Sequence, residues 1–512
     1  MPFDSFKDAR DITTGAELTA DVCIAGAGAA GITIARSLLK SGVSVCLLEA
    51  GGLSIDPDVA SLSVIENVGR QYTPNEFRLR YFGGTTNHWG GHCVPLSPFD
   101  LQPRDWVEHS GWPYSFDELR PYYELAHEVL GIGDFSYDAA AVATQLGVPL
   151  LTFDGHKVET TVSRYNRLRF GLTYGPELDA SERLQCVLYA DLSAIDLVEP
   201  DSEIVKSVRV RSVARNEFTV RAGYFVIACG GIENARVLLS SRHQRTAGLG
   251  NHSDLVGRFF MEHLWYESGY LLPNEPVSSY PHYVQEIEFE NIGARFHIAV
   301  PDDEQRRLRI PAFRAELQAR SAAYWELHTI RTHGLTLHDV SALTASPFEL
   351  GHALRCRGDA TPNALVLMNH VEQVPNPESR VTLSDQRDAL DRPHARLNWR
   401  LSPQDHEGVV KAQDVVAREA GRSGVGRMRI GIRDRYELEL EGVDGGGHHM
   451  GTTRMHHDPA RGVTDGTGRV HYTQNLYVAG SSLFPTCGYA NPTLTIVATS
   501  LRLAEAIKNR LA

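Results

Sequence analysis

The stretch Asp21-Val-Cys-Ile-Ala-Gly26-Ala-Gly28-Ala-Ala-Gly31 decides the fold of the first part of the chain. It starts as a short apolar strand and ends in a glycine-rich turn. Residues Ile32 to Lys40 follow at helical spacing, and Val43 to Leu48 form a second apolar run. The order of strand, glycine turn, helix and strand predicts a βαβ unit that binds a dinucleotide.

The three glycines of this turn stand where a dinucleotide pyrophosphate requires them. Gly26 permits the tight bend, Gly28 lets backbone N–H groups approach the pyrophosphate, and Gly31 permits close packing of helix on strand. Glu49 closes the second strand, where an acid accepts hydrogen bonds from the ribose hydroxyls. The alternative for Glu49 is a strand-end carboxylate that only faces water.

Composition limits the partners and the compartment. The 512 residues suggest two or three structural units at about 150 residues per domain. A net charge of −13 argues against nucleic acid as a partner. The seven cysteines show no CxxC pair or metal-ligand spacing, which favours free thiols in a reducing compartment. Residues Met1 to Ala20 lack the features of a signal peptide, and no apolar run approaches the ~20 residues of a membrane span, so we expect a cytoplasmic protein without a membrane partner.

Apolar runs and turn residues predict further elements along the chain. Residues Phe82 to Gly91 are too rich in glycine for a helix or a strand, and the middle of the chain, from about 269 to 440, reads as a second domain of mixed strands and loops. The other expected elements are a helix over Trp112–Leu130 started near Ser115, strands between Val187 and Val226, an apolar strand at Phe225–Cys229, a helix over Glu233–Ser241, a strand at Asn475–Ala479 and a final helix over Asn491–Leu511.

The last part of the chain carries two specific motifs. In Gly445–Met455 a histidine precedes Gly-Thr by three residues, and in Asn475–Thr495 a strand ending in Ala-Gly-Ser-Ser leads to Asn-Pro. These motifs resemble the C-terminal signature of the glucose-methanol-choline (GMC) oxidoreductases. The resemblance extends to the first glycine turn, the Gly83-Gly84 loop, Val256–His263 and Ser379–Leu383, and it is weakest from about 270 to 370.

The resemblance implies FAD as the cofactor, and an α/β fold in which a Rossmann-like FAD-binding domain joins a second α+β substrate domain built on an antiparallel sheet. The expected bounds are 16–140, 181–265 and 445–512 for the FAD-binding domain, 141–180 for a linking segment on the substrate side, and 266–444 for the substrate-binding domain. The residues expected to contact FAD are Gly26, Gly28, Ala29, Gly31, Glu49, Ala50, Gly83, Gly84, Asn87, His88, Leu192, Ala228, Gly480, Pro492 and Thr493.

Alcohol oxidation by a flavin removes a hydroxyl proton and a hydride from one carbon, so a base must lie beside the flavin. Histidine, with an ordinary pKa of ~6.5, accepts a proton near neutrality. His448 matches the catalytic histidine of the family, whereas His449 stands at a variable position. Asn491 matches the second site residue, which hydrogen-bonds the substrate oxygen. It also stands where it can cap the last helix, ahead of Pro492.

His88 stands four residues after Gly84, at the position of a histidine that is covalently joined to the flavin in some sugar and choline oxidases of the family. A non-covalent contact with FAD is the alternative. Trp89 resembles the Thr-His-Trp of pyranose oxidases, which favours a sugar, a glycoside or a polyol-like alcohol as substrate. We therefore expect an FAD-dependent alcohol or sugar dehydrogenase or oxidase that passes electrons to oxygen or to another carrier. An FAD-containing lyase and a flavoprotein without enzymatic activity are the alternatives.

Overall fold

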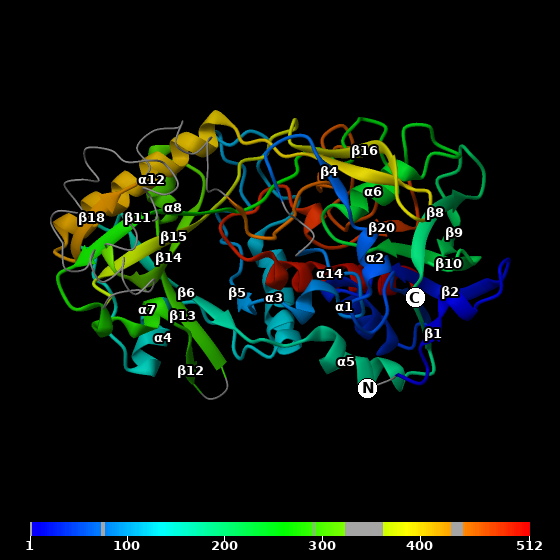
Figure 1. Cartoon of the computed structure of the whole chain (residues 1–512), viewed down its shortest axis with the longest axis horizontal. Helices are drawn as coiled ribbons and strands as arrows, with labels where there is room; N and C mark the ends of the chain where they lie inside the picture. Colours follow the sequence, from blue (N-terminus) through cyan, green and yellow to red (C-terminus); the bar gives the residue numbers. More distant parts are fainter. Residues whose placement is uncertain (1–2, 73–76, 290–291, 323–361, 432–443) are drawn as a thin grey trace.

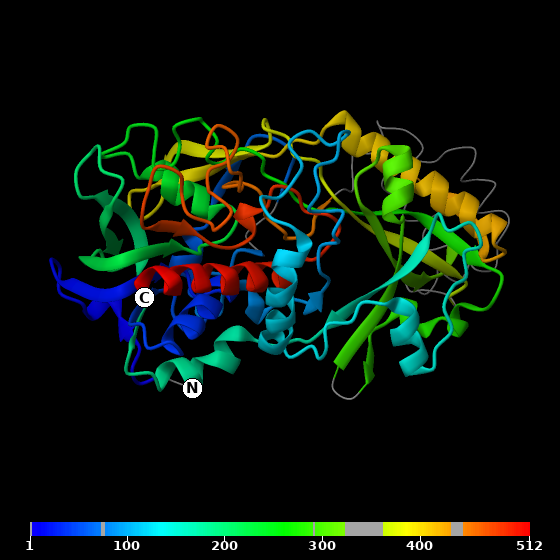
Figure 2. The same cartoon turned by 180° about the vertical axis from the view of Figure 1, so that it is seen from behind.

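The computed structural model describes residues 3–72, 77–289, 292–322, 362–431 and 444–512. Within these residues the chain forms two large sheets and a small third one. Figures 1 and 2 show that the first and last parts of the chain lie together at one end of the long axis, while the middle part forms the other end. No helix of the described ranges is both long and apolar enough to cross a membrane.

The first sheet is the predicted dinucleotide-binding sheet. Its central strands pair in parallel, and residues such as Val22, Ile24 and Leu47 are fully buried, as parallel strands covered on both faces require. The strand order is β1 (Lys7–Asp8), β7 (Leu184–Leu188), β3 (Val45–Leu48), β2 (Glu17–Ala25), β10 (Glu217–Ile227), β9 (Val205–Arg211) and β8 (Asp191–Leu197), with β20 (Leu476–Val478) parallel to β10.

Helices cover this sheet at the predicted places, with small shifts at their ends. Helix α1 (Ala29–Leu39) begins directly after Gly28, and α14 (Pro492–Leu511) packs on both α1 and α3 (Phe116–Leu130). Helix α3 starts later than the predicted Trp112 because Ser115 and Glu118 form a reciprocal capping box there. Helix α6 (Glu233–Ser240) also lies at its predicted place, whereas helix α5 (Phe170–Asp179) was not predicted. The glycine-rich loop holds a short 3-10 turn, η3 (Gly84–Asn87).

The second sheet is antiparallel throughout its described pairs, which confirms the expected α+β substrate domain. Its order is β18 (Gly426–Ile430), β11 (Leu264–Pro273), β15 (Ala364–Val371), β14 (Phe313–Arg320), β13 (Ile292–Ala299), β6 (Glu159–Tyr165) and β5 (His92–Cys93), with β12 (Ile287–Phe289) beside β13 and β19 (Asp444–Gly445) beside β11. Four helices lie at the same end of the molecule as this sheet (Figure 1): α4 (Ala139–Leu146), α7 (Pro281–Val284), α8 (Asp302–Leu308) and α12 (Pro403–Arg422). The bounds of the two domains stay a prediction.

Strand alternation gives the second sheet a polar face. On β14 the residues Phe313, Ala315 and Leu317 are fully buried, and Arg314 and Glu316 alternate with them on the opposite face. The register places Arg314 opposite His370 of β15, and His370 opposite Trp265 of β11. Polar side chains from three neighbouring strands therefore gather on one side of the sheet.

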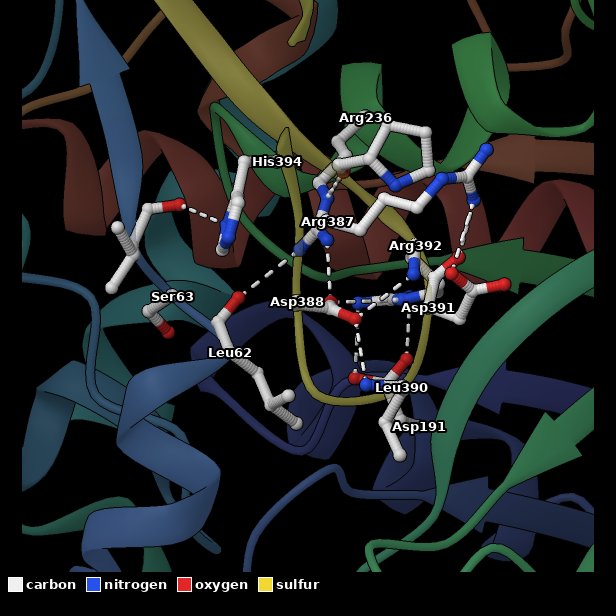
Figure 3. Close-up of polar contacts among 12 residues, drawn as sticks. Leu62, Ser63, Asp191, Arg236, Arg387, Asp388, Leu390, Asp391, Arg392 and His394 are labelled. Atoms are coloured by element: carbon white, nitrogen blue, oxygen red, sulfur yellow. Dashed lines mark hydrogen bonds and ion pairs between the residues drawn. The ribbon is translucent and has the colours of Figure 1, made fainter. Parts of the chain in front are cut away.

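A third sheet of β16 (Arg380–Arg387), β17 (Pro393–Asn398) and β4 (Ile65–Asn67) is fixed to the first domain by buried charges. Figure 3 shows the loop between β16 and β17 reaching Arg236 and Asp191. Oδ2 of Asp388 accepts a hydrogen bond of 2.6 Å from Arg236, and Arg392 donates to the carbonyl of Leu192 at 2.8 Å. The side chain of Asp388 is completely shielded from solvent. Its negative charge and the positive charge of Arg236 therefore stabilise each other in place of water.

We expect Asp388→Asn to lower the free energy of unfolding by about 3 kcal/mol, because it leaves buried arginine charge without its partner. The matched control is Asp391→Asn in the same loop. The side chain of Asp391 is 75% exposed, and asparagine tolerates the left-handed backbone conformation at this position. This control changes the free energy by less than about 0.5 kcal/mol. Urea unfolding followed by circular dichroism measures both. Equal losses in the two variants would contradict a stabilising role for the buried pair.

Candidate active site

One cavity of about 780 Å³ joins the two halves of the molecule. Its lining includes Gly28 and Glu49 from the dinucleotide turn, His448 from the C-terminal motif, and Glu316 and His370 from the polar face of the second sheet. The volume lies within the range of cofactor and ligand sites. The predicted cofactor residues and the predicted base therefore share one space with the second sheet.

The glycine turn has the shape that a dinucleotide requires. At Gly26 the backbone φ is +102°, and an added Cβ would lie 2.5 Å from the carbonyl oxygen of Ala228. At Gly31 a Cβ would lie 1.8 Å from the carbonyl oxygen of Gly26, so only glycine permits this helix to pack on this strand. A Cβ at Gly28 meets nothing within 4 Å, and Gly28 precedes the N-terminus of α1 at the cavity wall. The open floor at Gly28 fits a pyrophosphate over a helix N-terminus.

Glu49 is buried in the cavity wall, which makes the water-facing alternative wrong. Its side-chain oxygens accept hydrogen bonds from the backbone N–H of Ala27 at 2.9 Å and of Gly51 at 3.0 Å. Burial raises the pKa of the carboxyl, and the two N–H groups oppose that shift. Each carboxylate oxygen has a second lone pair, so a ribose hydroxyl can still donate to it.

The other expected cofactor residues divide into two groups. Asn87 supports the loop, because its amide donates to the carbonyl of Phe82 at 2.8 Å, and Gly83 bonds the carbonyl of Ala27 through its own N–H at 2.8 Å. Gly31 serves helix packing. The remaining expected residues line the cavity together with Gly26, Gly28 and Glu49. They are Ala29, Ala50, Gly84, His88, Leu192, Ala228, Gly480, Pro492 and Thr493.

A cluster of buried charges beside Leu192 was missed by the sequence analysis. Arg80 lies 2.8 Å from Asp191 and 2.9 Å from Glu233, and Arg78 lies 3.0 Å from Glu233. All four residues line the cavity. Glu233 follows the Gly230-Gly231 turn and could have been noticed there, but its partners come from distant segments that carry no motif.

His448 and His263 form a directional pair. The Nδ1 atoms of the two rings are 2.8 Å apart, and Nε2 of His263 lies 3.0 Å from the carbonyl oxygen of Gly488. A carbonyl only accepts, so His263 carries its proton on Nε2. Burial lowers the pKa of His263 to about 3, which keeps the ring neutral and leaves its Nδ1 as an acceptor. His448 therefore donates from Nδ1, and its Nε2 is left with a free lone pair.

The same surroundings keep His448 uncharged. Burial lowers its pKa well below the ordinary value, and the neighbouring His263 lowers it further. His448 lines the cavity, and its Nδ1 is already bound to His263. Nε2 is thus the ring nitrogen that is available to take a proton from a molecule in the cavity.

Glu262 holds the backbone behind the base. One carboxylate oxygen accepts from the N–H of His448 at 2.9 Å, and the other accepts from the hydroxyl of Tyr72 at 2.5 Å. The Tyr72 oxygen in turn lies 2.6 Å from Nε2 of His449. Burial raises the pKa of Glu262 to about 7 and lowers that of His449 to about 3. His449 is tied into this supporting network, which accords with its variable position in the resemblance.

Asn491 occupies the N-cap position of α14, but its side chain makes no capping hydrogen bond. Its Oδ1 instead accepts from Nη2 of Arg314 at 3.1 Å. Because Asn491 lines the cavity and its oxygen is taken, the two N–H bonds of the amide are the groups left for a ligand. The side-chain capping role that the sequence allowed is wrong for this residue.

The polar face of the second sheet forms the far wall of the cavity, and sequence analysis did not find it. Arg295 lies 3.0 Å from Glu316, and Nε2 of His370 lies 3.4 Å from the same carboxylate. Burial raises the pKa of the Glu316 carboxyl, but contacts with His370, His297 and Arg295 outweigh it and hold this pKa far below its usual range. The indole N–H of Trp265 and Nδ1 of His370 are buried and have no hydrogen-bond partner among the described residues. This wall therefore offers an ionised acceptor at Glu316, with the charged Arg295 beside it.

Comparison with known proteins gives relatives over nearly the whole length. The chain is 28% identical to 6'''-hydroxyparomomycin C oxidase of Streptomyces lividus, covering 96% of this chain and 92% of that protein. It is 25% identical to the fructose dehydrogenase large subunit of Gluconobacter japonicus, covering 96% and 98%. Residues 375–500 match the family model described as GMC oxidoreductase.

The fold recurs in a solved structure. A formate oxidase variant of Aspergillus oryzae, studied for its FAD modification, superimposes with a TM-score of 0.58 at 18% identity, covering 98% of this chain and 99% of that one. The shared architecture supports the arrangement of glycine turn, C-terminal motif and antiparallel sheet described above. Residues 375–500 therefore carry the C-terminal domain of the GMC oxidoreductases, and the protein is an oxidoreductase that uses FAD.

Proposed function

We propose that this enzyme oxidises a CH–OH group of a sugar, a glycoside or a polyol-like compound. The observation that carries the proposal is that His448 and Asn491 share one cavity with the polar wall of the second sheet. FAD, when bound over the glycine turn, supplies the acceptor for the hydride of the alcohol carbon. The residues of the chain bind the substrate, orient its hydroxyl group and take its proton.

The proton goes to Nε2 of His448. Burial disfavours the charged form of the ring, so His448 is neutral at physiological pH. The neutral ring has a free lone pair on Nε2 that can accept the proton of the substrate. Once His448 is protonated, its Nδ1–H still donates to His263, which holds the ring in place. The amide N–H groups of Asn491 stabilise the oxygen from which the proton departs.

The polar wall supports a substrate with several hydroxyl groups. The Glu316 carboxylate lines the cavity and accepts hydrogen bonds from hydroxyls, and Arg295 beside it adds charged N–H donors. A polyhydroxylated molecule supplies both donors for the carboxylate and acceptors for the guanidinium. One relative is named for fructose and another for hydroxyparomomycin C, which supports the same class.

The electron acceptor is either oxygen or another carrier, since the relatives include an oxidase and a dehydrogenase. We also propose that the enzyme works in the cytoplasm. The six described cysteines are all free thiols, and this supports a reducing compartment.

We expect His448→Ala to keep FAD bound and to slow flavin reduction by about 10² to 10⁴, the usual contribution of a general base. Anaerobic mixing with a panel of neutral sugars and polyols, followed by flavin absorbance, first identifies a substrate and then gives the rate. The exposed His457, in the same stretch of chain, provides the control variant His457→Ala. An unchanged rate in His448→Ala removes His448 from its role. Substrate consumption without flavin bleaching in the parent enzyme would point to the lyase alternative.

Replacing Glu316 by Gln tests the polar wall. The expected result is a rise in the substrate dissociation constant of roughly 10- to 100-fold with a smaller change in the limiting rate of flavin reduction, because the carboxylate binds hydroxyls that do not react. Glu407→Gln, at a side chain that is 61% exposed in the same half of the chain, is the control. A large loss of limiting rate with unchanged affinity would contradict a role in substrate binding.

We propose that His88, which lines the cavity, would hold the cofactor through a bond from its imidazole to the 8α carbon of the flavin. This bond would replace one C–H bond of the 8-methyl group and one N–H bond of the imidazole. Two protons would be released, and the two electrons would pass to the flavin ring and then to the electron acceptor of the enzyme. After acid precipitation we expect the yellow colour in the pellet and an intact mass above that of the bare polypeptide. His88→Ala releases the colour into the supernatant. If the parent protein also releases all of its colour, His88 makes a non-covalent contact.

A further inference from the structure

Arg314 is a buried guanidinium without a carboxylate partner. It is 1% exposed on β14, and among the described residues no acid forms an ion pair with it. Glu316, two residues along the same face, pairs with Arg295 at 3.0 Å. The Nε and Nη1 atoms of Arg314 have no hydrogen-bond partner in the described part of the chain.

Stability gives no reason for such a residue. Burying a charge without a partner destabilises the fold, and the ring of Tyr489, whose centroid lies 5.6 Å from the guanidinium carbon, offsets only a small part of that cost. A methionine would fill similar space without this cost. The retained charge therefore points to a role in the chemistry of the cavity.

The contact with Asn491 shows what that role is. Nη2 of Arg314 donates to Oδ1 of Asn491 at 3.1 Å, and this bond fixes which end of the amide faces the ligand. We propose that Arg314 is a positioning residue that turns the N–H groups of Asn491 toward the reacting oxygen and places a fixed positive charge behind them. The proposal rests on the proposed function of this site.

The proton balance assigns each group its part. The O–H bond of the substrate breaks, its proton forms a bond to Nε2 of His448, and the electron pair stays on the substrate oxygen. Asn491 donates to that oxygen, and the charge of Arg314 stabilises it through the amide. Without Arg314 the amide can rotate and present its oxygen, which repels the developing negative charge.

Arg314 also acts on the base. Burial lowers the pKa of both His448 and His263 the most, neighbouring histidine rings lower it further, and the charge of Arg314 adds to the lowering at both rings. Glu262 faces His448 only through the backbone N–H. Removing the charge therefore raises the pKa of His448. The acidic limb of the rate profile, below which the base is protonated and the reaction stops, then moves to higher pH.

The test compares Arg314→Gln, Arg314→Lys and the control Arg307→Gln, which removes an exposed arginine just before the same strand. Anaerobic stopped-flow measurement of flavin reduction across pH is the readout. We expect Arg314→Gln to lower the limiting rate by roughly 10- to 10³-fold and to move the acidic limb up by about one pH unit. Arg314→Lys keeps the limb in place and loses part of the rate. A limb that is unmoved in Arg314→Gln, or moved equally in both variants, overturns the proposal.

A second readout needs no substrate, so it separates this proposal from the proposed function. In FAD-loaded protein with ¹⁵N-labelled histidine, the His448 signals are assigned by their loss in His448→Asn. The parent shows the Nδ1–H tautomer well below pH 6.5, and Arg314→Gln titrates about one unit higher. Identical titrations overturn the proposal even where a substrate reduces the flavin. If Arg314→Gln does not fold, Arg314→Lys provides the test. An increase in the pKa of His448 of more than a few tenths of a unit in this variant overturns the proposal, because the lysine keeps the positive charge.

Discussion

The site depends on the parallel pairing of β2, β3, β10 and β20, which ends all four strands at one edge of the first sheet. Parallel strands bring their carboxyl ends together, and ligands of open α/β sheets bind there. The chain returns to this sheet from positions far apart in the sequence, and β20 pairs with β10 near its end. The turn after β2, Glu49 after β3 and Gly480 after β20 consequently line one cavity. Asn491 lies directly before α14, further along the chain from β20, so the expected cofactor and substrate residues are positioned by the same sheet.

Loss of water is the second constraint on the chemistry. Histidine exposed to water is partly charged near neutral pH, and a charged ring takes up no proton. Burial lowers the pKa of His448, His263 and His449, so these rings are neutral before substrate arrives. In a pair of neutral rings, one ring donates the hydrogen bond and the other accepts it. The carbonyl of Gly488 accepts from Nε2 of His263, so in the pair next to the cavity His263 accepts and His448 donates. A buried backbone carbonyl thus determines which nitrogen of His448 is available to a molecule in the cavity.

The sequence reveals those parts of the site that depend on neighbours along the chain. The glycine turn, His448 and Asn491 stand in short motifs, and each of them lies at the cavity. The start of a helix also depends on residues nearby in the sequence. Helix α3 begins after its N-cap Ser115, only a few residues later than predicted. The polar wall has no such local signal, because Arg314, His370 and Trp265 meet through the register of three strands separated by long connections. The cap position of Asn491 is predictable too, but the choice of its side chain between the helix and Arg314 is a tertiary one.

The fixed charge of Arg314 acts in opposite directions on the two products of proton transfer. It stabilises the negative oxygen of the substrate and destabilises the protonated ring of His448, so equal distances to both would cancel the benefit. The bond to Asn491 breaks this symmetry, because it places the guanidinium directly behind the group that contacts the oxygen. The penalty on the ring is useful afterwards. When the oxygen becomes a neutral carbonyl, only the destabilised proton on His448 remains beside Arg314, and it leaves readily. One buried arginine therefore favours both the departure of the proton from the substrate and its release from the base.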